Sequence, residues 1–290
     1  MKEICFFNHY HNGDLISSKS FITEIMSKIN TKYYYRHCMN QKVLSDLDIE
    51  YVGIPIHPMS DKIIEDENIV YVNTWIGSYF ENDEFCGDVS LLGIHNMFGK
   101  VYGTLNKIFD ANLKLNDHIN YFPKINYSKF NTSNIDSYLK DDVNTKILFC
   151  NGEPLSGQCT YTGDMKEIIE NEAQTHPNKT FITTKKINSN IDNIKFTGDI
   201  INSIDKCDLN EISYLSTFCN LIIGRNSGPH CFTMVDDNLK NKEKTFYSFS
   251  SYDKKICLPR DLDLECNFIF EEYINYQCLE KSISELVSKL

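Results

Sequence analysis

Long apolar runs are missing from this 290-residue sequence, and their absence excludes a membrane-spanning helix. No stretch reaches about 18 consecutive apolar residues, the length that such a helix needs. The apolar run near the N-terminus, Ile4-Cys5-Phe6-Phe7, is also shorter than the apolar core of a secretory signal peptide. We interpret it as a first buried β-strand and expect a cytoplasmic protein.

Positive charge is also in short supply, because 29 Lys and Arg stand against 40 Asp and Glu, giving a net charge of −11. Nucleic-acid binding needs a basic surface, so nucleic acid is excluded as the main partner. Hydrophobic residues, at 41%, nevertheless supply the material for a sizeable core, so the chain is expected to be globular.

Several motifs of metal and cofactor sites are absent. The eleven cysteines include no Cys-x-x-Cys pair, which argues against a zinc ribbon and favours reduced, buried thiols. The GxGxxG, GxxxxGK[ST], HExxH and GxSxG patterns are missing too. Of the two Asp-x-Asp triplets, the one at 46–48 falls in an expected helix or loop, and the one at 261–263 lies late in the chain and isolated. We therefore expect neither a bound metal nor a resident cofactor.

Short apolar runs alternate with helical periodicity along the chain, which predicts βαβ units and parallel sheets. After the first strand, Ile22, Ile25, Met26 and Ile29 repeat with the spacing of one helix face. The same succession of strand, polar turn and helix begins again at Lys146. We predict an α/β protein with two Rossmann-like domains that face a central cleft.

The polar segment 126–145, rich in Asn, Ser and Asp, is interpreted as the connection between the domains. We place the N-terminal domain at residues 1–140 and the C-terminal domain at residues 141–275. Residues 276–290 carry apolar side chains along one face and predict a helix, which we expect to pack back on the N-terminal domain. Ligands of such sheets bind at the carboxyl ends of the strands, so the turns after strands are the candidate sites.

The turn after the first strand carries two histidines and a carboxylate. Asp14 is placed to act as a general base on a hydroxyl group, or simply to cap the helix that follows. His9 and His11 form a His-x-His pair, but the spacing predicts no third metal ligand, so lining a substrate pocket fits them better than zinc. We assign four residues of this turn to the lining of the substrate pocket: His9, His11, Asn12 and Gly13.

A better-defined strand–turn–helix unit runs from Leu221 to Val235. Its two glycines permit a tight turn and the close approach of a ligand. The backbone amides that open the helix predict an anion cradle suited to a diphosphate, and Arg225 adds a cation. The alternative is an ordinary turn in which Gly and Pro serve only the backbone geometry.

A third turn, residues 151–158, follows the first strand of the second half. Polar glycine-containing turns are common in this position, so the pattern is less specific than the one at Arg225. We predict that the turn faces the same diphosphate from the other side. The residues assigned to the diphosphate ligand are Arg225, Asn226, Ser227, Gly228, His230, Gly152 and Glu153.

Two of these segments resemble one protein family, the heptosyltransferase-like GT-B glycosyltransferases. Gly13-Asp14-Leu15 resembles the turn after their first strand, and Asn226-Ser227-Gly228-Pro229-His230 resembles their Asp-[Ser/Thr]-Gly-x-x-His donor loop. Asn226 stands where that loop has an acidic residue, and His230 comes one residue early. Arg225, immediately before the loop, resembles instead the pattern of the bacterial and viral fucosyltransferase-like enzymes, in which a cation neutralises the leaving diphosphate.

The resemblance implies a metal-independent Leloir glycosyltransferase of polysaccharide biosynthesis. Its co-substrate would be a nucleoside-diphosphate sugar, bound mainly by the C-terminal domain. Its acceptor would be a saccharide, a glycan or a lipid-linked molecule, bound mainly by the N-terminal domain with Asp14 as the catalytic base. Where the acceptor lies in a membrane, the protein would work at the periphery of that membrane.

Two alternatives stay open. One is a nucleotide-sugar epimerase of GT-B architecture. The other is a non-catalytic sugar- or nucleotide-binding protein, in which Asp14 only caps a helix.

Overall fold

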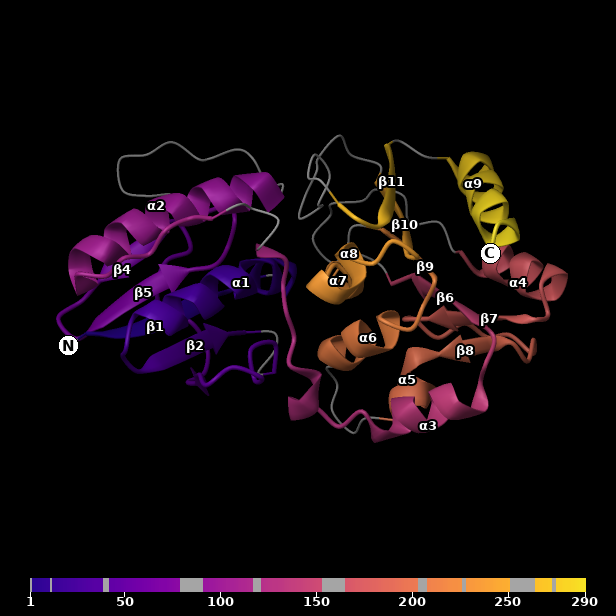
Figure 1. Ribbon diagram of the computed structural model, residues 1–290, viewed down its shortest axis with the longest axis horizontal. Helices are drawn as coiled ribbons and strands as arrows, with labels where there is room; N and C mark the ends of the chain where they lie inside the picture. Colours follow the sequence, from indigo (N-terminus) through magenta and orange to yellow (C-terminus); the bar gives the residue numbers. More distant parts are fainter. Residues whose placement is uncertain are drawn as a thin grey trace. The chain divides into compact units, whose positions relative to one another are not determined.

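The chain folds into two α/β units, each with its own sheet (Figure 1). The computed structural model describes residues 2–10, 12–38, 42–78, 91–116, 121–152, 165–202, 208–225, 228–250, 264–272 and 275–290. Among these residues, one unit ends at Lys129 and the other begins at Phe130. The α/β class with parallel sheets is therefore confirmed.

A five-stranded sheet in the order β3-β2-β1-β5-β4 forms the centre of the first unit. Its strands are β1 (Glu3–Asn8), β2 (Tyr33–His37), β3 (Glu50–Tyr51), β4 (Ile63–Glu65) and β5 (Ile69–Asn73). Neighbouring strands are parallel, except that β4 runs antiparallel to β5. The strand order reverses between β1 and β5, and open α/β sheets bind ligands at the carboxyl ends of the strands at such a point.

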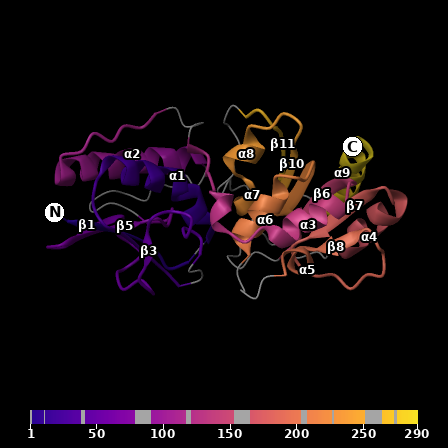
Figure 2. The same cartoon turned by 60° about the horizontal axis from the view of Figure 1, so that its bottom comes forward.

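β1 is buried on both faces. Cys5 and Phe7 pack with Tyr71 on one face. Because side chains alternate along a strand, the neighbouring apolar residues of β1 point to the other face. Helices α1 (Asn12–Lys28) and α2 (Leu91–Phe109) lie together on the same side of the sheet (Figure 2). Phe21 of α1 stacks on Phe98 of α2 with ring centroids 4.3 Å apart, which joins the two helices.

A buried ion pair fixes α1 to the loop after β2. Lys19 lies on α1, and its Nζ is 2.6 Å from the carboxylate of Asp46. Asp46 also accepts a hydrogen bond of 2.9 Å from the backbone N–H of Asn126. The first Asp-x-Asp triplet thus contributes to structure, because Asp46 neutralises a lysine that would otherwise be buried without a partner.

The sheet of the second unit has six strands in the order β11-β10-β9-β6-β7-β8, and all neighbours are parallel. Its strands are β6 (Thr145–Cys150), β7 (Lys179–Thr183), β8 (Ile194–Phe196), β9 (Leu221–Arg225), β10 (Thr245–Ser250) and β11 (Asn267–Glu272). The order reverses between β6 and β9, which gives this unit a ligand-binding edge of the same kind as the first.

Helices cover both faces of the second sheet. α4 (Lys166–Thr175) and α9 (Tyr276–Ser288) share a hydrophobic core with one face of β6, β9 and β10. The short helix α7 (Gly228–Thr233) lies on the opposite face. Its His230 contacts Gly224 of β9 and Ser248 of β10, and these two positions face away from the α4–α9 core because side chains alternate along a strand. The remaining helices of this unit are α3 (Ser133–Asp141), α5 (Thr197–Ile201), α6 (Leu209–Ser216) and α8 (Asp236–Leu239), and the 3₁₀ turn η2 (Tyr127–Lys129) closes the first unit.

The apolar face of the C-terminal helix α9 is buried in the second unit. Leu279, Ile283 and Val287 share its core with Ile168 and Ile169 of α4. Burial of that face next to the sheet removes the apolar surface that would have had to find a partner elsewhere. Among the described residues, no helix is long and apolar enough to cross a membrane.

Candidate functional site

The first candidate site lies at the carboxyl ends of β1 and β5. These strands end at two buried asparagines that order the loops after them. Asn8 Oδ1 accepts a hydrogen bond from the backbone N–H of Tyr10 (2.8 Å), and Asn73 Oδ1 accepts one from that of Trp75 (2.9 Å). Both loops therefore leave the sheet edge with their first residues held in place.

Asp14 occupies the first turn of α1 at this edge. It is the third residue of the helix and only 3% exposed. Its carboxyl group accepts hydrogen bonds from the Asn8 side chain and from the backbone N–H of Ile76. Asn8 is the last residue of β1, and Ile76 lies in the loop after β5. The carboxyl thus connects three segments of the sheet edge, which is more than capping its own helix requires.

Burial raises the pKa of Asp14 to about 7, because an ionised carboxylate loses solvation in the interior. The Lys62 cation and the hydrogen bonds from Asn8 and Ile76 act in the opposite direction and favour ionisation. A pKa near 7 is well matched to a general base that works at neutral pH. The environment of Asp14 is therefore that of a group able to take up a proton and release it again.

Lys62 belongs to this site and was missed by the sequence analysis. Its side chain is fully buried, and Nζ donates to the backbone oxygens of Asn73 (2.7 Å) and Trp75 (2.9 Å). In the sequence Asp61-Lys62-Ile63-Ile64-Glu65 the lysine looks like an ordinary surface charge beside a short strand. Only the pairing of β4 with β5 brings it next to Asp14.

Three of the four residues predicted to line the substrate pocket lie around the same edge, namely His9, Asn12 and Gly13. The His9 ring nitrogen Nε2 is 3.0 Å from the backbone oxygen of His57. Asn12 and Gly13 open α1 immediately before Asp14, and Gly13 is buried. His11 lies outside the described residues. Within the described part of the chain, no three His, Cys, Asp or Glu side chains are grouped to hold a metal ion.

The second candidate site lies at the carboxyl ends of β6 and β9, where Cys150 pairs with Gly224. A Cβ added at Gly224 would lie 2.6 Å from His230 Nδ1 and 2.9 Å from Cys150 Cβ, so only glycine fits there. Arg225, the last residue of β9, is buried. Gly228 opens α7, and no atom of the described residues lies within 4 Å of a Cβ added to it.

His230 is fully buried. Its Nε2 is 2.6 Å from Ser248 Oγ, and burial lowers the pKa of the ring to about 3. The ring is therefore neutral at pH 7 and packs α7 against β9 and β10. The predicted donor-binding role of His230 stays a prediction, and the backbone amide of this residue is its group that belongs to the predicted anion cradle.

The turn after β6 is described only in part. Asn151 is buried and clamps the end of β7, since its Nδ2 donates to the backbone oxygen of Lys185 (3.0 Å) and its Oδ1 accepts from the Lys185 backbone N–H (2.8 Å). Gly152 follows, and no atom of the described residues lies within 4 Å of a Cβ added to it. Three residues of the predicted donor side, Glu153, Asn226 and Ser227, lie outside the described residues.

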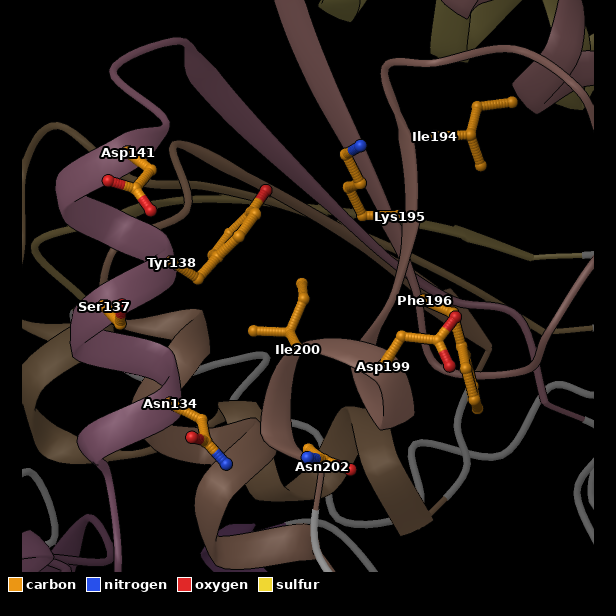
Figure 3. Close-up of a pocket in the computed structure, with 10 residues that line it drawn as sticks. All are labelled: Asn134, Ser137, Tyr138, Asp141, Ile194, Lys195, Phe196, Asp199, Ile200 and Asn202. Carbon is orange, nitrogen blue, oxygen red and sulfur yellow. The ribbon is translucent and has the colours of Figure 1, made fainter.

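A separate cavity of about 610 Å³ lies in the second unit, where α3, β8 and α5 meet (Figure 3). Tyr138, Ile200 and Phe196 contribute its apolar wall, and Asp141, Lys195 and Asp199 contribute its charged groups. None of the predicted site residues lines it. β8 is the outer strand of the sheet, so this cavity is distinct from the edge where the strand order reverses.

Comparisons with known proteins find relatives by structure alone. No known family model matches the sequence, and no curated protein matches it. The family 9 glycosyl transferase from Veillonella parvula aligns with a TM-score of 0.57 at 12% identity, over 99% of this chain and 95% of that one. Escherichia coli heptosyltransferase WaaC with ADP aligns with a TM-score of 0.56 at 7% identity, over 99% of both chains.

The E. coli ADP-heptose lipopolysaccharide heptosyltransferase II gives the same result, with a TM-score of 0.52 at 11% identity over 100% of this chain and 99% of that one. At these identities the likeness establishes the fold. This chain has the fold of the heptosyltransferase-like GT-B glycosyltransferases, as the resemblance of its two motifs predicts. The alignments span both units, so the likeness is not confined to one Rossmann-like sheet.

Proposed function

We propose that this protein is a glycosyltransferase that moves a sugar from a nucleoside-diphosphate sugar to a hydroxyl group of a saccharide, glycan or lipid-linked acceptor. Asp14 acts as the general base. It takes the proton from the acceptor hydroxyl as the oxygen bonds to the anomeric carbon, and the nucleoside diphosphate leaves with the electron pair of the broken bond.

The observation that carries this proposal is the environment of Asp14. A buried carboxyl with a pKa of about 7 stands at the carboxyl edge of a parallel sheet, in a chain with a GT-B fold. Burial at this depth opposes the ionisation of a carboxyl group. Carboxyl groups with pKa values raised in this way are concentrated at functional sites, which favours a functional role for Asp14 over a purely structural one.

The donor is proposed to bind at the β6–β9 edge of the second unit. The reversal of strand order, the tight turn at Gly224 and the open backbone of Gly228 support this assignment. Arg225, Asn226, Ser227, Gly152, Glu153 and the backbone of His230 remain the predicted contacts. Two structural neighbours are named with ADP or ADP-heptose, which makes ADP the first nucleotide to test.

The binding experiment is a thermal-shift comparison of ADP, GDP, UDP, dTDP and CMP with the full chain. A nucleotide bound only by the folded state raises the melting temperature. We expect a nucleoside diphosphate to stabilise the protein more than CMP does. No stabilisation by any nucleotide would remove the proposed donor site.

Turnover separates the two alternatives. An epimerase of GT-B architecture would release nucleoside diphosphate and free sugar without an acceptor saccharide, whereas a transferase needs the acceptor. A non-catalytic binding protein would bind nucleotide without any turnover. In the transferase, Asp14→Ala keeps nucleotide affinity and loses transfer, and unchanged transfer in this variant would reject Asp14 as the base.

A further inference from the structure

Two aromatic side chains form an open corner at the edge of the first sheet. Tyr10 follows β1 and is 50% exposed, and Trp75 follows β5 and is partly buried. Their ring centroids are 5.4 Å apart and their planes meet at 60°. Tyr10 is one of few large hydrophobic side chains that are half exposed in the described residues, and Trp75 is the sole tryptophan of the sequence.

The Trp75 ring is held in position by its surroundings. Its backbone N–H donates to Asn73 Oδ1, and its backbone oxygen accepts hydrogen bonds from Lys62 Nζ (2.9 Å) and Ser78 Oγ (2.7 Å). The ring lies over Gly77, where an added Cβ would come within 2.4 Å of it. A side chain at position 77 would therefore displace the indole.

The groups that hold this corner also surround Asp14. Asn8 binds the Tyr10 backbone and the Asp14 carboxyl. Ile76, whose backbone N–H is bonded to Asp14, is the neighbour of Trp75 in the chain. Lys62 contacts the Trp75 backbone and acts on the charge of Asp14. The two aromatic residues and the carboxyl thus share the partners Asn8 and Lys62.

An open aromatic corner beside a buried carboxyl suits a neutral ligand with one apolar face and a rim of hydroxyl groups. The C–H groups on one face of a pyranose ring match the negative face of an aromatic ring. A phosphate is a poorer match, because Lys62 is fully buried and an ionised Asp14 repels an anion.

We propose that Tyr10 and Trp75 bind the pyranose ring of the acceptor saccharide, with its apolar face on the aromatic corner and one hydroxyl group directed at Asp14. The identification of the bound sugar as the acceptor rests on the proposed function. It adds a specificity element: the acceptor residue is a sugar ring, and its apolar face is what the corner recognises.

The lone tryptophan provides a direct binding signal in the full chain. We expect methyl glycosides of common hexoses to change the intrinsic fluorescence of Trp75 in a saturable way, whereas sorbitol, a polyol without a ring, leaves it unchanged. The absence of a saturable response to every glycoside would overturn the proposal. A response to ADP but to no glycoside would also overturn it, because the corner would then belong to the nucleotide.

Variants of the corner sharpen the assignment. Tyr10→Ala and Gly77→Ala should each weaken glycoside binding and raise the acceptor KM by about threefold to tenfold with little change in kcat, since stacking stabilises ground state and transition state alike. Tyr10→Phe keeps the ring and should restore binding. Phe218→Ala removes an exposed aromatic of the second unit and should have no effect.

The outcomes separate this inference from the proposed function. Transfer with an unchanged acceptor KM in Tyr10→Ala would reject the corner and leave the glycosyltransferase intact. Glycoside binding that needs Tyr10, in a protein that transfers no sugar, would support the corner as a saccharide site and reject the proposed reaction.

Discussion

The two units have sheets of related topology, but Lys62 of the first unit lies in a different setting from the buried lysines of the second unit. In the second unit, buried lysines serve helix ends: Lys244 Nζ donates to the backbone oxygens of Ser216, Thr217 and Cys219 at the end of α6, at 2.6–2.9 Å. Lys146 and Lys179 do the same for the segment after α3 and for the end of α9. In the first unit, Lys62 instead lies at the carboxyl edge of the sheet, beside Asp14.

The difference shows how to separate structural from functional burial. A cation at a helix C-terminus satisfies carbonyl oxygens that the helix leaves unpaired, so its burial has a structural reason. Lys62 also donates to carbonyl oxygens, but these belong to the loop that carries a buried carboxyl. The second unit contributes a turn shaped by Gly224, and the first contributes ionisable side chains, as expected if one binds a donor and the other does the proton chemistry.

The largest expected effect belongs to Asp14→Asn. The amide keeps the shape of the side chain but cannot accept the proton, so the transfer rate should fall by about 100- to 10,000-fold. Nucleotide affinity, measured by calorimetry, should stay the same. Asp199→Asn removes an exposed carboxylate of the second unit and is the matched control. Equal transfer rates in the two variants would contradict the role given to Asp14.

Lys244→Met tests the structural side of the comparison. Loss of the ammonium removes a donor from the backbone oxygens of Ser216, Thr217 and Cys219, so we expect about 3 kcal/mol of lost stability in denaturant unfolding. Lys242→Met, at an exposed neighbouring lysine, should be close to neutral. The pH dependence of transfer should not change in either variant. A change in Lys244→Met would contradict the purely structural role given to Lys244.

Gly224→Ala probes the shape of the turn in the second unit. The new methyl group would meet the His230 ring and Cys150 Cβ, both held by the sheet, and overpacking of this kind costs about 1–3 kcal/mol. Gly228→Ala meets no atom within 4 Å and serves as the reference in the same thermal unfolding measurement. Similar melting temperatures for the two variants would show that β9 and α7 can separate without cost.

Lys62→Met should have a smaller and pH-dependent effect. Transfer needs ionised Asp14, so kcat/KM should rise with pH through about 7 in the wild-type protein. The Lys62 cation lowers the pKa of Asp14, so its removal should raise that pKa and move the rise to higher pH. A rise of about one pKa unit would lower the ionised fraction of Asp14 at pH 7, and with it kcat/KM, by about fivefold, with recovery in alkaline buffer. Lys2→Met, an exposed cation of the same unit, should leave the profile in place.

Much of the fold was predictable because its signals are local. The apolar run Leu221-Ile222-Ile223 predicts a buried strand, and β9 contains it. Asp14 could be proposed as a site residue because it follows the first strand and opens a helix. Lys62 was not predictable, since nothing near it in sequence reveals the carboxyl that it faces. The burial of His230 was missed for the same reason: Gly224 and Ser248, which enclose its ring, are contributed by two different strands.

The sequence by itself determined the α/β class, the two sheets and the turns that reach their carboxyl ends, because strand and helix periodicity and turn residues act over a few positions. The tertiary structure decided which charges are buried, which rings stay open and which helix ends need a lysine. Those properties depend on pairing between distant segments, such as β4 with β5 and β9 with β10. The pKa of Asp14 and the corner of Tyr10 and Trp75 exist only once these pairings have formed.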